Sequence, residues 1–337
     1  MQPKILLITG TPTSGKGTFT SLLDDHDDIF AIPAWHDKLL NAHLYIDNIE
    51  SRGLLQCGKY AHLIEYLHKI LANSDWHILR VFAFQQELIF PLNSLKSISI
   101  PFNLDFEMLN ENILLDLSNI QKNDFTCSKA FYVVIKNLIK SITPEKKIKY
   151  FISQGLNGFY DYELFFKKYP NSKAIYLKRE PIDWLFSWIN RTSGCEINKF
   201  KEITLSLKQR QHPSSNFIFN SLNSSSIIEH IQKKYPDRLM IVNFNDVILN
   251  TKKTMNNVAE FIKIKKLDTL YTSSILGNKI EAIGTIEDDT EKMMTVEHKK
   301  LLKKLIASYF PNDNKNTIRK IIKYILPYGI VRSIQKY

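Results

Sequence analysis

The sequence predicts an α/β protein with three layers, in which helices cover both faces of a central parallel sheet. Three observations predict this fold class. A short apolar run of strand-forming residues, 5–8, stands near the start of the chain and leads into a glycine-rich turn. Similar strand-like runs recur at 149–154, 173–179 and 239–244, and segments with helical spacing alternate with them. Such alternation is typical of parallel sheets.

The turn after the first strand has the spacing of a phosphate-binding loop. Gly10, Gly15 and Gly17 fall within eight positions, although the whole chain holds only 11 glycines. A strand, a glycine-rich turn and a helix bring backbone N–H groups and a helix N-terminus together on a phosphate. The spacing Gly10-x-x-x-x-Gly15-Lys16 fits the P-loop, which predicts a fold similar to the P-loop NTPases. Gly17 stands where Ser or Thr normally ligates Mg²⁺, and Thr18 comes one position late.

A second short strand is expected at residues 29–32, after an acidic turn that ends the first helix. Trp35, His36 and Asp37 then come at the far end of that strand. In open α/β sheets this edge is where ligands bind. The segment is therefore a candidate for part of a ligand site.

The chain is expected to form a single domain over residues 1–337, with two additions to the sheet. Residues 38–147 are expected to be a mostly helical insertion that shapes an acceptor pocket, since helical spacing is clear at 59–71 and at 131–142. Residues 290–337 are expected to form a basic and amphipathic helical segment at the C-terminus.

A second candidate anion site follows the strand at 173–179. Arg179 stands at the strand end, and Pro181 fits the first position of a following helix, with Asp183 in its first turn. Ser187 comes two turns into that helix. A guanidinium and a hydroxyl suit a terminal phosphate. Together with the loop, this segment predicts a ligand that carries two separated anionic groups.

Composition restricts the remaining choices. The chain has 337 residues, 44% of them hydrophobic and 23% charged, which is ordinary for a globular protein. The net charge is +11, but there is no Arg-rich or aromatic-interleaved basic patch, so no nucleic-acid partner is expected. No signal peptide or transmembrane span is expected. Three scattered cysteines show no pairing pattern and no metal spacing, so a cytoplasmic location is expected.

These motifs resemble those of the PAPS-dependent sulfotransferases of bacterial type, whose donor is 3′-phosphoadenosine 5′-phosphosulfate (PAPS). The family's first motif, Gly-x-Pro-[Arg/Lys]-Ser-Gly-Thr-Thr, is similar to residues 10–18, and His26-Asp27-Asp28-Ile29 resembles the His-Pro-x-Ile that follows it. The second motif, Arg-[Asp/Glu]-Pro-x-Asp-x-x-x-Ser, matches residues 179–187 position for position. The family's later strand and helix around Glu-Asp-Leu are similar to residues 242–262.

The resemblance implies a role for each motif residue. The 5′-phosphosulfate is expected to lie on the loop, and the 3′-phosphate on a second group of residues, with no metal required. The loop residues are Thr13, Ser14, Gly15, Lys16, Gly17 and Thr18, and the second group is Arg179 and Ser187. Because Thr13 stands where the family has a basic residue, Lys16 is expected to assist departure of the bridging oxygen.

The acceptor side is also expected from the resemblance. Family members use a His or Glu as general base, in one branch on the strand end after the first helix. Here that segment offers His36 as the catalytic base and Asp37 as the second choice. The acceptor is expected to be a saccharide or glycan, since residues 326–332 resemble tails on bacterial surface-polysaccharide enzymes.

Two alternatives stay open at the level of the sequence. A nucleoside or small-molecule kinase that uses Mg·ATP would share the loop, with Ile113-Leu114-Leu115-Asp116 as its Walker B strand. A non-catalytic assembly protein would keep a degenerate loop and bind a membrane surface weakly through its C-terminal helices, where isoleucines stand beside basic residues at 318–325.

Overall fold

The computed structural model describes nine segments of the chain, which form two compact units. The described segments are residues 2–11, 13–31, 87–91, 97–101, 104–120, 127–154, 162–194, 196–280 and 294–309. The first unit comprises Met1–Trp188 and Asn220–Met293, and the second comprises Ile189–Phe219 and Met294–Tyr337. The first unit holds the sheet and both predicted anion-binding motifs. The expectation of a single domain stays a prediction.

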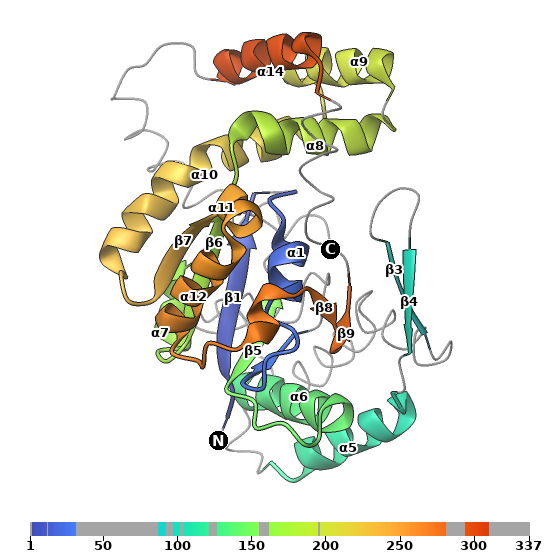
Figure 1. The fold of residues 1–337 in the computed structure, drawn as a ribbon, viewed down its shortest axis with the longest axis vertical. Helices are drawn as coiled ribbons and strands as arrows, with labels where there is room; N and C mark the ends of the chain where they lie inside the picture. Colours follow the sequence, from blue (N-terminus) through green and yellow to red (C-terminus); the bar gives the residue numbers. More distant parts are fainter. Residues whose placement is uncertain are drawn as a thin grey trace, which may run out of the picture. The chain divides into compact units, whose positions relative to one another are not determined.

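A five-stranded parallel sheet forms the centre of the first unit, as the sequence predicts (Figure 1). Its strand order is β2-β5-β1-β6-β7, so the N-terminal strand lies in the middle of the sheet. The strands are β1 (Lys4–Gly10), β2 (Ile29–Phe30), β5 (Tyr150–Gln154), β6 (Lys173–Lys178) and β7 (Leu239–Asn243). The carboxyl ends of these strands therefore lie along one edge of the sheet.

Alternate residues of β1 face two separate hydrophobic cores, which makes three layers. Ile5 and Leu7 belong to one core, with side chains from α5 (Phe106–Ser118), α6 (Cys127–Ile142), α7 (Tyr162–Lys168) and α10 (Ser215–Lys234). Leu6 and Ile8 belong to the other, with side chains from α1 (Lys16–Ser21), α11 (Phe244–Leu249) and α12 (Thr251–Ile262). The three-layer α/β/α fold class is confirmed.

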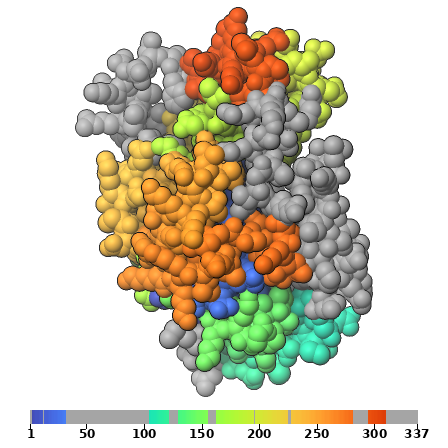
Figure 2. All heavy atoms as spheres, viewed as in Figure 1, coloured from blue at the N-terminus to red at the C-terminus, as the bar shows by residue number. Residues whose placement is uncertain are grey.

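Helix α12, on the face of the sheet that Leu6 and Ile8 occupy, buries a stripe of apolar residues at helical spacing. In α12 the buried positions Met255, Val258, Ala259 and Ile262 follow the i, i+3, i+4, i+7 pattern, and Lys263 ends the helix in the left-handed conformation. In the space-filling view, residues 244–280 (orange) form much of one face, and the blue N-terminal residues show only in small areas beside them (Figure 2). Residues Ile5, Leu6, Leu7 and Ile8 of β1, the strand that carries the loop, are 0% exposed.

The described part of the insertion contains a strand pair as well as helices. β3 (Glu87–Pro91) and β4 (Ser97–Pro101) form an antiparallel hairpin, so the mostly helical expectation missed it. The short alternation in Ser97-Ile98-Ser99-Ile100 is the period-two signal of a strand. The helix expected at 131–142 is confirmed within α6, whereas the one expected at 59–71 lies outside the described residues.

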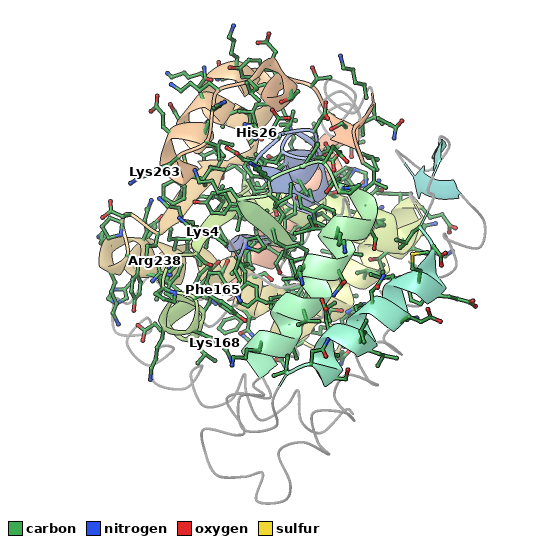
Figure 3. All side chains as sticks on the ribbon, turned by 90° about the horizontal axis from the view of Figure 1, so that it is seen from below. Lys4, His26, Phe165, Lys168, Arg238 and Lys263 are labelled. Atoms are coloured by element: carbon green, nitrogen blue, oxygen red, sulfur yellow. The ribbon has the colours of Figure 1, made fainter. Side chains whose placement is uncertain are left out.

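Cations at the amino-terminal edge of the sheet, among them Arg238 (labelled in Figure 3), bind carbonyl groups where helices and their following turns end. The Arg238 guanidinium donates to the carbonyl oxygens of Phe166, Tyr169 and Ser172, after α7. Lys173 and Lys149 donate to carbonyl oxygens at the end of α12. Helix C-termini carry partial negative charge, so these cations stabilise the fold locally.

The second unit contains the end of α8 (Pro181–Ser193), α9 (Ile197–Lys208), the start of α10 and α14 (Val296–Tyr309). α9 and α14 pack together: the Phe200 ring lies 4.6 Å from the His298 ring, and the Tyr309 hydroxyl donates to the Leu207 carbonyl at 3.1 Å. Within the described ranges, no helix has both the length and the apolar content to cross a membrane. The C-terminal segment from 310 onward lies outside them.

Candidate functional site

The loop between β1 and α1 lies against neighbouring residues at two positions where only glycine fits. A Cβ atom on Gly15, whose φ is 85°, would lie 1.9 Å from Cε2 of Phe244. A Cβ atom on Gly10 would lie 2.7 Å from the Leu177 carbonyl oxygen of β6 and 2.5 Å from Ser14 Oγ. The two glycines therefore let the loop fold closely over the carboxyl ends of β6 and β7.

The structure brings Arg179 onto the loop. Gly10 pairs with Leu177 in the sheet, so Arg179 follows β6 at the same edge. Its Nη1 donates to the Thr13 carbonyl oxygen at 2.7 Å, and Thr13 Oγ1 donates to the Trp184 carbonyl oxygen of α8 at 3.0 Å. The two predicted motifs, 166 positions apart in the chain, thus meet in one place.

Three buried polar atoms at this place have no hydrogen-bond partner among the described residues. They are Thr11 Oγ1, Ser14 Oγ and Arg179 Nε. Buried polar groups are almost always paired, because leaving one unpaired costs about 1–3 kcal/mol. All three can donate, and one of them carries positive charge. The site is therefore built to receive an anion with several acceptor oxygens.

Lys16 lies beneath the loop. It is 6% exposed, and its Nζ donates to the carbonyl oxygens of Gly10 at 3.4 Å and Thr11 at 3.1 Å. Burial lowers its pKa to about 8. Burial also lowers the pKa of Arg179, which the nearby Asp183 carboxylate opposes. An anion on the loop would favour the charged form of both side chains.

Phe244 is a site residue that the sequence did not reveal. It is the first residue of α11, directly after β7, and it is 2% exposed. Its ring contacts Gly15 and lies 5.2 Å from the Cζ atom of Arg179. An aromatic residue at the carboxyl end of β7, the strand that pairs with the Arg179 strand β6, is a signal that could have identified it. Gln154, also missed, ends β5 and donates to Thr20 Oγ1 at 2.8 Å.

The remaining predicted residues fall into two groups. Gly17, Thr18 and Ser187 are partly exposed, and a Cβ atom on Gly17 would meet nothing within 4 Å. Ser187 lies on α8, two turns after Arg179. His36 and Asp37 lie outside the described residues, so their role as general base stays a prediction.

His26 forms hydrogen bonds that stabilise the fold. Its Nδ1 accepts from the Asp28 backbone N–H at 3.0 Å, and Nε2 lies 2.9 Å from the Lys265 carbonyl oxygen. The ring is 1% exposed. It therefore ties the turn before β2 to the chain after α12.

The Walker B strand considered for a kinase is wrong. Residues 113–116 lie within helix α5, because its apolar positions Leu109, Ile113 and Leu117 repeat at helical spacing and are buried. The Asp116 carboxylate accepts hydrogen bonds from two side chains of the neighbouring helix α6, Lys136 at 3.1 Å and Asn137 at 2.9 Å. The carboxylate that would hold magnesium in a kinase is therefore not supplied by this segment.

Comparison with known proteins gives the family. The family model described as "Sulfotransferase domain" matches residues 3–325. The sulfotransferase domain from the curacin biosynthetic pathway is 14% identical, with 90% of this chain and 97% of that chain covered and a TM-score of 0.47. The one from the Synechococcus PCC 7002 olefin synthase is also 14% identical, with coverages of 93% and 97% and a TM-score of 0.47. A sulfotransferase from Mycobacterium avium is 10% identical, with coverages of 97% and 77% and a TM-score of 0.40.

No curated protein sequence matches the chain. The family model nevertheless spans both motifs, the loop at 10–18 and the segment at 179–187, and nearly the whole chain. The chain therefore belongs to the sulfotransferase domain family and is a PAPS-dependent sulfotransferase.

Proposed function

We propose that this enzyme transfers a sulfuryl group from PAPS to a hydroxyl of a saccharide or glycan, and that the loop and Arg179 bind the two ends of the donor. The observation that carries the proposal is the meeting of the two motifs, where Arg179 donates to Thr13 and three buried donors have no partner in the part of the chain that the structure describes. Together they fit a nucleotide with a phosphate at both the 3′ and the 5′ position.

The loop is the proposed site of the 5′-phosphosulfate. Its hydroxyls on Thr11 and Ser14 are buried and have no partner within the described ranges, and the first N–H groups of α1 lack intrahelical acceptors. Within the predicted loop set 13–18, residues 16–18 supply these N–H groups, and Lys16 also supplies its ammonium. Arg179, together with Ser187 on α8, is the proposed site of the 3′-phosphate.

Lys16 is proposed to stabilise charge in the transition state. As the acceptor oxygen forms its bond to sulfur, the bond from sulfur to the bridging 5′-phosphate oxygen breaks, and negative charge collects on that oxygen. A buried ammonium stabilises such charge more strongly than one in water. Thr13, which replaces the family's basic residue, donates its hydroxyl to the Trp184 carbonyl, so this role falls to Lys16.

The acceptor hydroxyl must lose a proton in the same step. We propose His36 as the base that takes it, with Asp37 as the alternative, and such a base contributes about 10²–10⁴-fold to the rate. The products are a sulfate ester, adenosine 3′,5′-bisphosphate and the protonated base. Replacing His36 by Ala should lower turnover and leave nucleotide affinity intact. Equal turnover in the two proteins would remove His36 from this role.

No metal is proposed to take part. Gly17 supplies no hydroxyl at the position where P-loop kinases ligate Mg²⁺, and Asp116 lies in a helix. We also propose a cytoplasmic location, which the scattered, unpatterned cysteines support. Membrane-surface association of the C-terminal helices stays a prediction.

An acceptor screen tests the chemistry directly. The purified chain is incubated with PAPS and a panel of saccharides, steroids and aliphatic alcohols, with EDTA in one series and Mg²⁺ in another. Formation of the 3′,5′-bisphosphate is then measured. The proposal predicts turnover with saccharides that EDTA does not abolish. Turnover only with apolar alcohols would contradict the acceptor class, and loss of turnover in EDTA would contradict the metal-free step.

A further inference from the structure

One aromatic ring contacts both anion-binding segments of the site. Phe244 lies against Gly15 so closely that a Cβ atom there would come within 1.9 Å of Cε2 and 2.3 Å of Cδ2 of the ring. The same ring lies 5.2 Å from the Arg179 Cζ atom. Phe244 follows β7 in the sequence, so it lies outside both motifs, the loop at 10–18 and the segment at 179–187.

The ring and the loop together fix the Arg179 guanidinium from two directions. The separation of 5.2 Å falls within the range in which a guanidinium is attracted to an aromatic ring. Nη1 is held by the Thr13 carbonyl at 2.7 Å, while Nε is buried and has no partner among the described residues. Arg179 is thus oriented before any ligand arrives, and one of its donors is left over.

The loop side of this contact is under backbone strain. Thr13 is β-branched, yet its φ is 55°, in the left-handed region where such residues are rare. A strained residue of this kind persists only where surrounding contacts hold it. Here the bonds from Arg179 and to Trp184 hold Thr13, and the Phe244 ring packs on Gly15 two positions later.

We propose that Phe244 is a positioning residue that couples the loop to Arg179, so that the two phosphates of the donor bind cooperatively. It touches no reacting atom. Phe244 keeps Arg179 oriented while the loop is folded over the sheet edge. Less conformational entropy is therefore lost when the donor binds, because the loop and Arg179 are already ordered. This inference rests on the proposed function for the identity of the two ligand groups.

The test measures a ratio: the affinity for adenosine 3′,5′-bisphosphate divided by the affinity for 5′-AMP, each from calorimetry. Phe244→Leu should lower this ratio by about 3–30-fold, the range expected from loss of a cation–π contact in a desolvated site. Phe244→Tyr, which keeps the ring, should retain the ratio. Phe244→Met keeps the bulk without the ring and serves where the leucine variant does not fold.

A matched control separates positioning from general packing. Phe165→Leu removes an aromatic ring that is 0% exposed in the core on the other face of the sheet, on α7 (Figure 3). It should lower the midpoint of thermal unfolding and leave the affinity ratio unchanged. If the leucine and methionine variants of Phe244 also lose stability with an unchanged ratio, Phe244 only packs and the inference is overturned.

The same titrations distinguish this inference from the proposed function. Arg179→Ala should abolish the preference for the 3′,5′-bisphosphate, and adding Phe244→Leu to it should lower the ratio no further, because the two residues act through one contact. If Arg179→Ala leaves the ratio unchanged, the proposed 3′-phosphate site is wrong. If it lowers the ratio and the Phe244 variants do not, only the coupling is wrong.

Discussion

The two edges of the central sheet both gather cations, but they use them differently. At the amino-terminal edge, Arg238, Lys173 and Lys149 donate to carbonyl oxygens where helices end. At the carboxyl edge, Arg179 uses one donor on Thr13 and keeps Nε buried without a partner among the described residues. The positive charge of a cluster does not by itself indicate a ligand site. At the carboxyl edge the indication is that three buried donors from two segments lie together without a partner among the described residues.

The cluster at the amino-terminal edge shows why charge alone misleads. Burial lowers the pKa of Lys173, and the nearby charges of Lys263, Lys4 and Arg238 lower it further. Figure 3 shows Lys4, Arg238 and Lys263 at this edge. Seen without its hydrogen bonds, the group resembles an anion site, yet its donors serve the C-termini of helices.

The largest expected effect is at the carboxyl edge. Replacing Arg179 by Ala should weaken binding of adenosine 3′,5′-bisphosphate by about 100-fold, because a charge-assisted contact to phosphate is lost. Binding of 5′-AMP should weaken much less, because for this ligand only the bond that holds Thr13 in the loop is lost. An equal loss for both nucleotides in calorimetry would show that Arg179 supports the fold and not the 3′-phosphate.

Replacing the arginine at the amino-terminal edge should lower stability and leave nucleotide affinity unchanged. Replacing Arg238 by Ala should lower the free energy of unfolding by about 2–3 kcal/mol, since three carbonyl groups lose their donor. Nucleotide affinity should stay the same. Lys234→Ala is the matched control, because its ion pair with Glu163 is exposed and should contribute little to stability. Denaturant unfolding of the three proteins is the measurement, and a loss of nucleotide affinity in Arg238→Ala would remove the contrast.

Lys16 should make donor binding depend on pH. Its pKa is lowered to about 8 by burial, and a phosphate on the loop should raise it, because opposite charge favours the ammonium. Near pH 8.5 binding should therefore take up part of a proton, whereas below pH 7 the side chain is charged in both states. Calorimetry in two buffers of different ionisation enthalpy measures this uptake. The proton uptake due to Lys16 is the difference between the uptake of the unchanged protein and that of Lys16→Met. If the two uptakes are equal, the ammonium does not lie near the bound anion.

The smallest expected effect is at Gly17. A Cβ atom there meets nothing within 4 Å, and the residue lies in α1, so Gly17→Ala should raise the free energy of unfolding by about 0.5–1 kcal/mol. Gly15→Ala is its contrast, since it would collide with Phe244 and should destabilise the fold. Equal effects of the two substitutions on thermal unfolding would mean that the loop is not packed as described.

Much of the fold could be predicted because it depends on local patterns. Buried parallel strands appear as apolar runs, and β1, β5, β6 and β7 all lie where such runs predicted them. The hairpin β3–β4 was missed because each of its strands is only five residues long, and apolar runs this short do not distinguish a strand from a helix segment. Residues 113–116 illustrate the same ambiguity, since a short apolar run can belong to a strand or to a buried helix face.

The site was predictable only in part. The loop and Arg179 carry recognisable spacing, so the sequence identified both. Their contact, Arg179 to the Thr13 carbonyl, depends on the pairing of Gly10 with Leu177, which no local pattern contains. Phe244 was missed for the same reason, because its role comes from packing between segments more than 200 positions apart.

The most direct test of the central claim is a calorimetric titration of the intact chain with adenosine 3′,5′-bisphosphate, 5′-AMP and Mg·ATP. Clear preference for the 3′,5′-bisphosphate is expected, because the loop and Arg179 each bind one phosphate of the same ligand. Indifference to the 3′-phosphate, or preference for Mg·ATP, would contradict it and leave the unpaired donors at the carboxyl edge without a ligand.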